Sequence, residues 1–289
     1  MKRPLLLTFV LSLAASALAH ADEEKPFHRD AAAAETLGWH LATKAYTFRA
    51  YTLFETIDIS KELGVKYFEV NPTQKMSKNA PVNTDQTLTP ALRALLKKKF
   101  TDAGVQPVNF GVVKLTGDEA ADRKIFEFAK DMGIQTIVSE PDPAAFPILD
   151  KLCEDFQINV AIHNHPQPSP YWKPEIVLKA IDGHSKRIGA CADVGHWTRS
   201  GLDTVECLHQ MQGHIITLHF KDVDEQKQDV PWGTGNSNVK GMLDELHRQH
   251  FQGFFSMEYE SGNGRPSIDD LKKSIVTFDA EAKRILETK

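Results

Sequence analysis

The sequence predicts an α/β protein in which a single (β/α)8 barrel occupies residues 36–289. The first observation behind this prediction is that strand-like and helix-like segments alternate along the chain, eight of each. The second is that several helices end at a glycine directly before the next strand, as at Leu63-Gly64 and Met132-Gly133. The third is that no glycine-rich phosphate loop follows the first strand, which argues against the alternative, an open doubly wound sheet.

The expected strands are short runs of β-branched, aromatic or small residues next to Gly, Pro, Asn or Asp. In chain order they are Leu37–Ala42, Val65–Val70, Pro107–Val112, Thr136–Ser139, Asn159–Ile162, Ile188–Ala192, Ile215–Leu218 and Phe254–Met257. The segments between them have apolar residues at helical spacing. The expected helices are Thr52–Leu63, Pro90–Ala103, Ala120–Met132, Ala144–Phe156, Pro174–Ile181, Asp203–Met211, Val239–His250 and Ile268–Leu286. No linker divides this pattern, so we expect one domain.

The beginning of the chain has the pattern of a secretory signal peptide, residues 1–21. Met1-Lys2-Arg3 is basic, residues 4–19 form an apolar run, and Ala19-His20-Ala21 matches a cleavage site. The run is too short to cross a membrane comfortably. We therefore expect a periplasmic or secreted protein that is cleaved near Ala21 and makes no stable membrane insertion. Residues 22–35 are polar and rich in alanine, and we expect a poorly ordered lead-in there.

Charge and cysteine content limit the classes of partner. The chain has 34 basic and 39 acidic residues, and removal of the signal peptide would take away two of the basic ones. Such an acidic balance repels a nucleic-acid backbone, so we expect no nucleic-acid partner. Cys153, Cys191 and Cys207 form no C-x-x-C motif; we expect buried thiols, although two of them could pair in an exported protein. Whether the chain forms a homo-oligomer stays open.

Groups that can bind a metal or move a proton follow nearly every predicted strand. In a parallel barrel the carboxyl ends of the strands form the active site. Reading those ends in order gives His40, Glu69, Asn71, Lys114, Glu140, His163, Asn164, His165, Asp193, His196, His219, Lys221, Asp222, Glu258 and Glu260. Each has a structural explanation on its own: Glu140 could cap the next helix, and His219 could simply bond to Asp222. Their common location is what predicts a functional site.

Asp193 and His196 form a D-x-x-H sequence just past the sixth strand, where a carboxylate and an imidazole lie within reach of one divalent cation. With Leu-His-Phe-Lys-Asp around His219 and Ser-Met-Glu-Tyr-Glu around Glu258, this motif resembles the xylose isomerase-like TIM barrels of the sugar phosphate isomerase/epimerase family, which are related to the apurinic-site endonucleases. The segment 229–235, Asp-Val-Pro-Trp-Gly-Thr-Gly, is similar to that family's loop after strand seven. The resemblance extends from about Thr36 to the end of the chain.

In that superfamily one divalent metal is held by a Glu, an Asp, a His and a Glu from strands five to eight. The resemblance implies that Asp193, His219 and Glu258 are three of the ligands. This chain has His163 where the family has the first Glu. Since imidazole also binds such metals, we expect His163 to be the fourth ligand and Mn²⁺ to be the metal, with Zn²⁺, Fe²⁺, Co²⁺ or Mg²⁺ as alternatives. Glu140 could instead complete the set.

The resemblance implies a metal-dependent isomerase or epimerase of a sugar or keto-sugar that works through an enediolate. In this scheme Glu258 removes the proton next to the carbonyl, and Glu140, His163 or His165 returns it. Lys221 or Lys114 would polarise the substrate oxygen. The expected catalytic residues are Glu258, Glu140, His165 and Lys221. The expected substrate-binding residues are His40, Glu69, Lys114, His196, Trp197 and Trp232.

Three other functions are compatible with the sequence. A lyase that opens a 3-keto-glycoside uses the same first step; the predicted export favours it, as does the lack of a basic phosphate cradle in the predicted loops. A barrel without catalysis could bind carbohydrate on the rings of Trp39, Trp172, Trp197 and Trp232. A phosphodiesterase or abasic-site nuclease would need more histidines and a basic groove, which the negative charge does not favour.

Overall fold

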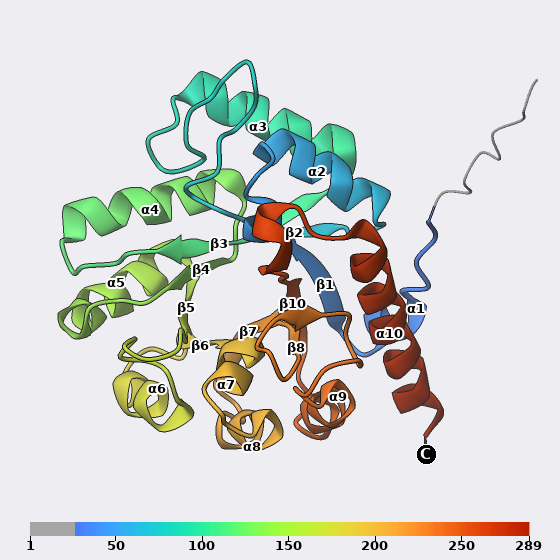
Figure 1. The fold of residues 1–289 in the computed structure, drawn as a ribbon. Coiled ribbons are helices and arrows are strands. Elements are labelled where there is room, and N and C mark those ends of the chain that lie inside the picture. The colour runs from blue at the N-terminus through green and yellow to red at the C-terminus, as the bar shows by residue number, and fades with distance from the viewer. Residues whose placement is uncertain (1–26, 289) are drawn as a thin grey trace, which may run out of the picture.

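The computed structural model describes residues 27–288, and it confirms the predicted barrel (Figure 1). Its parallel strands close in the order β1-β10-β7-β6-β5-β4-β3-β2. The strands are β1 (Trp39–Lys44), β2 (Tyr67–Val70), β3 (Gln106–Val113), β4 (Thr136–Ser139), β5 (Asn159–His163), β6 (Ile188–Asp193), β7 (Ile215–Phe220) and β10 (Gly253–Met257). The predicted signal peptide, residues 1–21, lies outside the described residues.

The helices form a ring around the barrel (Figure 1). They are α1 (Ala32–Thr36), α2 (Leu53–Glu62), α3 (Pro90–Ala103), α4 (Glu119–Met132), α5 (Phe146–Phe156), α6 (Pro174–Ile181), α7 (Val194–Arg199), α8 (Thr204–Gln210), α9 (Val239–Arg248) and α10 (Ile268–Glu287). The bounds of α3 are those predicted, because local signals set both ends. Thr89 caps its first turn, Pro90 stands at its first position, and Gly104 ends it with a φ of 69°.

Several strands extend beyond their predicted ends, and this extension positions the site. β5 includes His163, β6 includes Asp193, and β7 continues to Phe220. The barrel register pairs His163 with Cys191 and Asp193 with His219. The hydrogen-bonded ladder therefore continues past the predicted end of each of these strands. As a result, His163, Asp193 and His219 stand on the strands themselves and not on loops.

Residues 194–199 form a helix where the sequence predicted a loop. The Asp193 carboxylate accepts a hydrogen bond from the His196 backbone N–H at 2.8 Å and so caps α7. The D-x-x-H motif is thus a capped first turn, which fixes both side chains. The structure also contains a short antiparallel pair of strands that the sequence analysis did not predict, β8 (Asp222–Val223) and β9 (Asp229–Val230).

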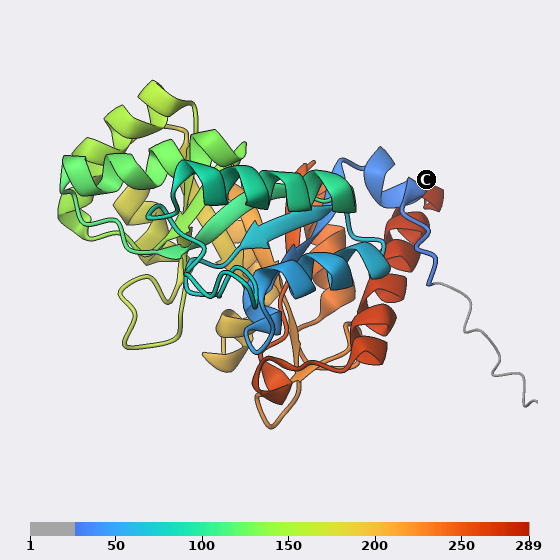
Figure 2. The same cartoon turned by 90° about the horizontal axis from the view of Figure 1, so that it is seen from above.

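One end of the barrel carries the segments that matter for the site. Figure 2, turned by 90° from Figure 1, shows α7, the loop of β8 and β9, and the 3₁₀ segment η3 (Ser261–Gly264) at the same end. These segments follow β6, β7 and β10 in the chain. This end is therefore the carboxyl end of the strands, where barrels of this kind form their active sites.

The start of the described chain is ordered against the last helix, so the expectation of a poorly ordered lead-in is wrong for residues 27–35. α1 lies beside α10 (Figure 1). Arg29 makes hydrogen bonds of 2.9 and 3.0 Å to the carboxylate of Asp279 on α10, and both side chains are largely buried. This charge-assisted, bidentate pair anchors the segment more firmly than its polar composition suggests.

The main hydrophobic core lies between the barrel and its helices. Trp39 packs against Phe255 with ring centroids 5.4 Å apart, and Trp232 packs against Phe278 at 6.0 Å. Large aromatic rings of this kind dominate the apolar area that a core buries. The three cysteines are free and buried, as predicted. Within residues 27–288, no helix combines the length and apolar character needed to span a bilayer.

Candidate metal centre and active site

The structure brings together the four residues predicted to bind metal. His163, Asp193 and His219 lie at the carboxyl ends of adjacent strands, and Glu258 follows β10 directly. One ligand atom from each lies within 4.8 Å of the others. Asp193 Oδ2 is 3.3 Å from His163 Nε2 and 3.6 Å from His219 Nδ1, and Glu258 Oε2 is 3.0 Å from His219 Nδ1. All four side chains are almost completely buried.

Glu69 orients His219 toward this cluster. His219 Nε2 donates to Glu69 Oε1 at 2.8 Å, which turns Nδ1 toward Asp193 and Glu258. Within the described residues, Nδ1 is buried without a well-formed hydrogen bond. Histidines that bind metals have their other ring nitrogen fixed by a carboxylate in this way. Two imidazole nitrogens and two carboxylates therefore fit a divalent transition metal such as Mn²⁺, Fe²⁺ or Zn²⁺.

Glu69 itself lies too deep to contact a substrate, so its predicted substrate-binding role is wrong. Its side chain is completely buried. It also accepts hydrogen bonds from Lys44 Nζ at 2.6 Å and from Ser256 Oγ at 2.7 Å. Burial alone would raise the pKa of Glu69, but the charges of His219 and Lys44 hold that pKa well below its usual range. Glu69 is thus a charged support beneath His219.

Lys221 is also buried, so its predicted contact with a substrate oxygen is wrong. Its Nζ lies 2.7 Å from Asp193 Oδ2 and 3.0 Å from Glu258 Oε2, and its side chain has no exposed surface. Burial would lower the pKa of Lys221, but attraction to Asp193 and Glu258 raises it above its usual value. A Cβ on Gly195 would lie 2.6 Å from Lys221 Cδ, so this glycine makes room for the lysine. Lys221 therefore offsets the charge of two carboxylates.

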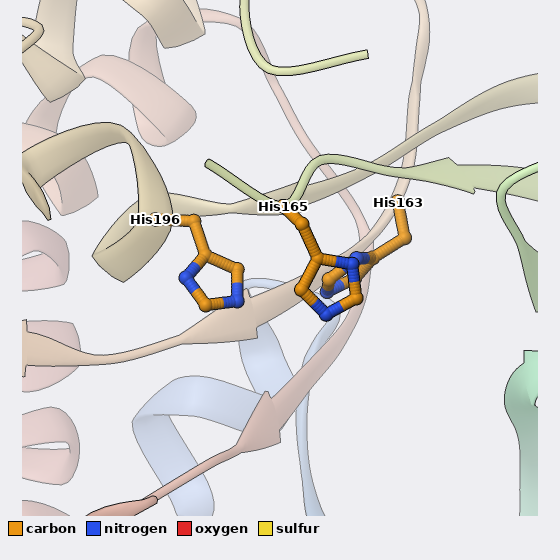
Figure 3. Close-up of side chains that lie close together, drawn as sticks. All are labelled: His163, His165 and His196. Carbon is orange, nitrogen blue, oxygen red and sulfur yellow. The ribbon is translucent and has the colours of Figure 1, made fainter. Parts of the chain in front are cut away.

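Three imidazole rings lie side by side at the edge of the cluster (Figure 3). His165 lies between the other two, with its ring centroid 4.3 Å from that of His163 and 5.0 Å from that of His196. His196 Nε2 is 3.6 Å from Asp193 Oδ2, and burial lowers the pKa of His196 to about 2, so this imidazole is neutral. His165 is the exposed member, with 48% of its side-chain surface accessible.

Glu140 holds two of these histidines in position. Its Oε1 accepts hydrogen bonds from His163 Nδ1 at 3.3 Å and from His165 Nδ1, and its Oε2 accepts from Ser169 Oγ at 2.9 Å. Burial would raise the pKa of Glu140, but the bonds from both histidines keep it below its usual range. The cluster contains His163 and not Glu140, and Glu140 does not line the cavity described next. The structure therefore places Glu140 behind His163 and His165 as a positioning residue, and its predicted part in proton transfer stays a prediction.

The cluster opens onto a cavity of about 220 Å³ at the carboxyl end of the barrel. His163, His165, His196 and Glu258 line it, and the other polar side chains of its wall are Lys44, Tyr46, Asn71, Thr73 and Glu260. Pockets for drug-sized ligands are larger, so this cavity suits a single sugar-sized molecule. Hydroxyl, amide, carboxylate and ammonium groups supply the donors and acceptors that sugar hydroxyls require.

Lys44 and Tyr46 are cavity residues that the sequence reasoning missed, because the first strand was placed too early. The predicted strand ends at Ala42, whereas β1 continues to Lys44. Lys44 Nζ donates to Glu69 Oε1 and, at 2.9 Å, to the carbonyl of Gly111. A lysine two residues past an apolar strand position, on the same face, was the available signal.

His40 lies at the opposite end of the barrel, so its predicted role in substrate binding is wrong. β1 begins one residue before it, which places His40 at the amino end of the strand. Its Nδ1 is 3.1 Å from Glu35 Oε2, and its ring centroid is 5.0 Å from that of Tyr67. Lys114 is 59% exposed and pairs with Asp142 at 2.5 Å, outside the cavity, so its predicted roles in catalysis and substrate binding are also wrong.

The predicted tryptophan contacts are wrong as well. Trp197 and Trp232 are each 1% exposed and line no part of the cavity. Trp232 packs against Phe220, with ring centroids 4.9 Å apart. Trp39 is buried too, and the partly exposed Trp172 does not line the cavity, so no tryptophan ring supports the alternative of a barrel that only binds sugars. His196 is the predicted substrate contact that does line the cavity.

Asp222 organises the loop after β7 and is not a bond partner of His219. Its carboxylate accepts hydrogen bonds from the backbone N–H groups of Gly233, Gly235 and Ser237 at 2.8, 2.8 and 3.0 Å. A Cβ on Gly235 would lie 2.5 Å from Asp222 Oδ1, so this close approach requires glycine. The alternative explanation of His219 as a structural histidine bonded to Asp222 is therefore wrong.

Comparison with known proteins agrees with this geometry. The family model of the xylose isomerase-like TIM barrel matches residues 57–279. An uncharacterised protein from Parabacteroides distasonis is 33% identical over 82% of this chain and 97% of its own, with a TM-score of 0.69. Two further solved structures share the fold at a TM-score of 0.65. One is a D-tagatose 3-epimerase-like protein, which is 17% identical over 86% of this chain and 98% of its own. The other is a D-psicose 3-epimerase in the presence of D-fructose, which is 14% identical over 86% of this chain and 99% of its own. No curated protein matches the chain. Because the family model spans most of the barrel, this chain belongs to the xylose isomerase-like TIM barrel family.

Proposed function

We propose that this protein is a divalent-metal-dependent isomerase or epimerase that acts on a keto-sugar by moving a proton next to its carbonyl group. The observation that carries the proposal is the cluster of His163, Asp193, His219 and Glu258 at the base of a cavity of about 220 Å³. The fold shared with a D-tagatose 3-epimerase-like protein and a D-psicose 3-epimerase supports a small carbohydrate as the substrate.

The same four side chains would hold one divalent cation, with Mn²⁺ as the first candidate and Zn²⁺, Fe²⁺, Co²⁺ or Mg²⁺ as alternatives. When bound, the cation would act as a Lewis acid that favours loss of a proton from the carbon next to a carbonyl. Lys221 and Lys44 offset the charge of the buried carboxylates. Glu69 and Glu140 hold the two histidine ligands by their other ring nitrogens.

Glu258 and His165 are the proton-transfer groups in this proposal. Both line the cavity, and they follow β10 and β5, which are separated in the barrel by β7 and β6. Glu258 takes a proton from one side of the sugar carbon. His165 returns one from the other side through Nε2, because Glu140 occupies its Nδ1. Since His163 replaces the family's first Glu, the pair consists of a carboxylate and an imidazole.

A lyase that eliminates the leaving group of a 3-keto-glycoside is the second candidate. It begins with the same removal of a proton by Glu258. The C–O bond one carbon further on then breaks, and the departing oxygen takes a proton from His165. The exposure of His165, 48% of its side-chain surface, favours this candidate, because an exposed acid can reach a leaving group that extends toward solvent.

Export is part of the proposal, since glycosides are met outside the cytoplasm. It rests on the sequence pattern of residues 1–21. Recovery of the chain from the periplasm or the medium, cut near Ala21, would support it. A full-length chain that stays in the cytoplasm would contradict it.

Incubation of Mn²⁺-loaded protein with free ketoses and 3-keto-glucosides in D₂O, followed by NMR, tests both candidates. Deuterium next to the carbonyl with the glycosidic bond intact supports the isomerase or epimerase, whereas release of the aglycone supports the lyase. Glu258→Gln and His165→Asn should each lower the rate by about 100-fold. The control His184→Asn alters a histidine that pairs with Asp150 outside the site and should keep the rate. No exchange and no elimination with any substrate contradicts the proposal.

A further inference from the structure

A basic cavity lies next to the proposed active site. It has a volume of about 420 Å³, and its charged lining residues are Arg49, Lys75, Lys78, Arg265 and a single acid, Glu55. They come mainly from the segments after β1, β2 and β10, which are neighbours in the barrel. Because no single loop contains all of the basic residues, the sequence does not reveal the cluster and only the fold assembles it.

Three of the four basic side chains have no acidic partner among residues 27–288. Lys78 Nζ pairs with Glu55 Oε1 at 2.6 Å. No described carboxylate oxygen lies within 4.0 Å of the charged nitrogens of Arg49, Lys75 or Arg265. The whole chain carries a formal net charge of −5, so this cavity runs against the overall charge. An uncompensated positive cavity of this kind attracts anions.

The two arginines of this cavity are held in position by aromatic rings. Arg49 Cζ lies 4.7 Å from the ring centre of Tyr46, and its Nη2 donates to the carbonyl of Glu260 at 3.0 Å. Arg265 Cζ lies 4.7 Å from the ring centre of Tyr51. A guanidinium stacked on a ring keeps N–H groups along its edge for a planar or tetrahedral oxyanion. The positive charges are therefore partly pre-arranged for binding.

The basic cavity shares a wall with the active-site cavity. Thr73 lines both of them. Tyr46 and Glu260, the two residues that contact Arg49, line the active-site cavity. The two cavities are therefore adjacent at Thr73.

We propose that the basic cavity binds an anionic group, a carboxylate, sulfate or phosphate, that the substrate carries at a distance from its reacting carbon. This inference rests on the proposed function, because it assigns a substrate class, anionic keto-sugars, to the same site. Arg49 and Arg265 donate charge-assisted hydrogen bonds to the anion, and Lys75 adds a third positive charge. The substituent fixes the orientation of the sugar ring beneath it.

Calorimetric titration of the full, Mn²⁺-loaded protein tests the inference. D-fructose, D-fructose 6-phosphate and D-fructuronate compare a neutral sugar with two kinds of anionic sugar, and inorganic phosphate and sulfate represent the free ions. We expect the anionic sugars to bind about tenfold more tightly than D-fructose. Arg265→Gln and Arg49→Gln should each remove that advantage. Arg123→Gln on α4, which breaks a half-buried pair with Glu119 away from both cavities, should keep it.

Equal affinity for D-fructose and its anionic derivatives would overturn the inference. The inference would also be overturned if the anionic sugars still bound more tightly than D-fructose to Arg265→Gln. The same holds if inorganic phosphate bound while the anionic sugars bound no more tightly than D-fructose. Arg265 is exposed, so its replacement leaves folding intact and the comparison valid. Failure of the proposed function looks different: the anionic sugars then bind more tightly, but no sugar exchanges a proton for deuterium. Because the cavity is open, added salt should reduce the advantage.

Discussion

Replacement of Glu69 by Gln should weaken metal binding without altering a ligand. The Glu69 carboxylate accepts hydrogen bonds from His219 Nε2, Lys44 Nζ and Ser256 Oγ at 2.8, 2.6 and 2.7 Å. Glutamine keeps the shape but loses the negative charge that faces His219 and Lys44. Loss of a residue that orients a ligating histidine costs about 10–100-fold in metal affinity, or about 1.4–2.8 kcal/mol. The unpaired Lys44 ammonium should also lower the free energy of unfolding by about 3–5 kcal/mol.

Competition with a chelating dye measures the metal affinity of this variant, and urea unfolding in EDTA measures its stability. Glu245→Gln is a matched control for the metal affinity, because Glu245 is also a largely buried glutamate but pairs with Arg248 on α9, at 2.6 Å. If Glu69→Gln does not fold, the double variant Lys44→Met/Glu69→Gln removes both buried charges and still deprives His219 of its carboxylate. A folded variant that binds Mn²⁺ as tightly as the wild type would refute the reasoning.

Three further predictions concern other contacts. Lys221→Met removes the ammonium between two ligand carboxylates. The Tm of this variant should therefore fall in EDTA, and saturating Mn²⁺ should restore it. A loss of Tm that Mn²⁺ does not restore contradicts this prediction. Asp222→Ala leaves three loop amides without their acceptor and should cost about 3 kcal/mol, with faster hydrogen exchange at Gly235; unchanged protection counts against it. The hydrogen bond from Arg248 lowers the pKa of Glu245 from 4.5 to about 2. This pair therefore stabilises the fold above the unfolded pKa and loses its contribution as pH falls from 4.5 toward 2. In urea titrations the stability difference between wild type and Glu245→Gln should shrink across that range, and a constant difference would contradict the assignment.

The fold could be predicted because local signals and topology agree. β4 has its predicted bounds, Thr136–Ser139, since a short β-branched run is set between a helix-ending glycine and a proline. α6 also has its predicted bounds, Pro174–Ile181, with proline at its first position. β1 was misplaced, because Gly38 ends a short helix and is followed by a strand whose last residue is the charged Lys44. The spacing of Lys44 from Ala42 indicates its face, but its burial has no local signal, since only its pairing with Glu69 on the neighbouring strand β2 makes a buried lysine tolerable.

The candidate site was predictable where a motif and a strand end coincide, as for Asp193, His219 and Glu258. The substrate-facing residues were not, because a shift of one or two residues changes the face and the depth of a side chain. His40 and Glu69 are both strand residues, yet one lies at the amino end of the barrel and the other is sealed inside it. Such differences depend on the register of neighbouring strands, which no single segment encodes.

Metal-dependent proton exchange tests the central claim most directly. The measurement is the rate at which a ketose takes up deuterium in D₂O as Mn²⁺ is added to metal-free protein. We predict that the rate rises with added metal and saturates at about one equivalent per chain, the number that a single four-ligand site accommodates. Asp193→Asn, which changes one ligand, should abolish this response. Exchange that is independent of metal, or that stays absent with every keto-sugar and every candidate metal, would contradict the proposed function.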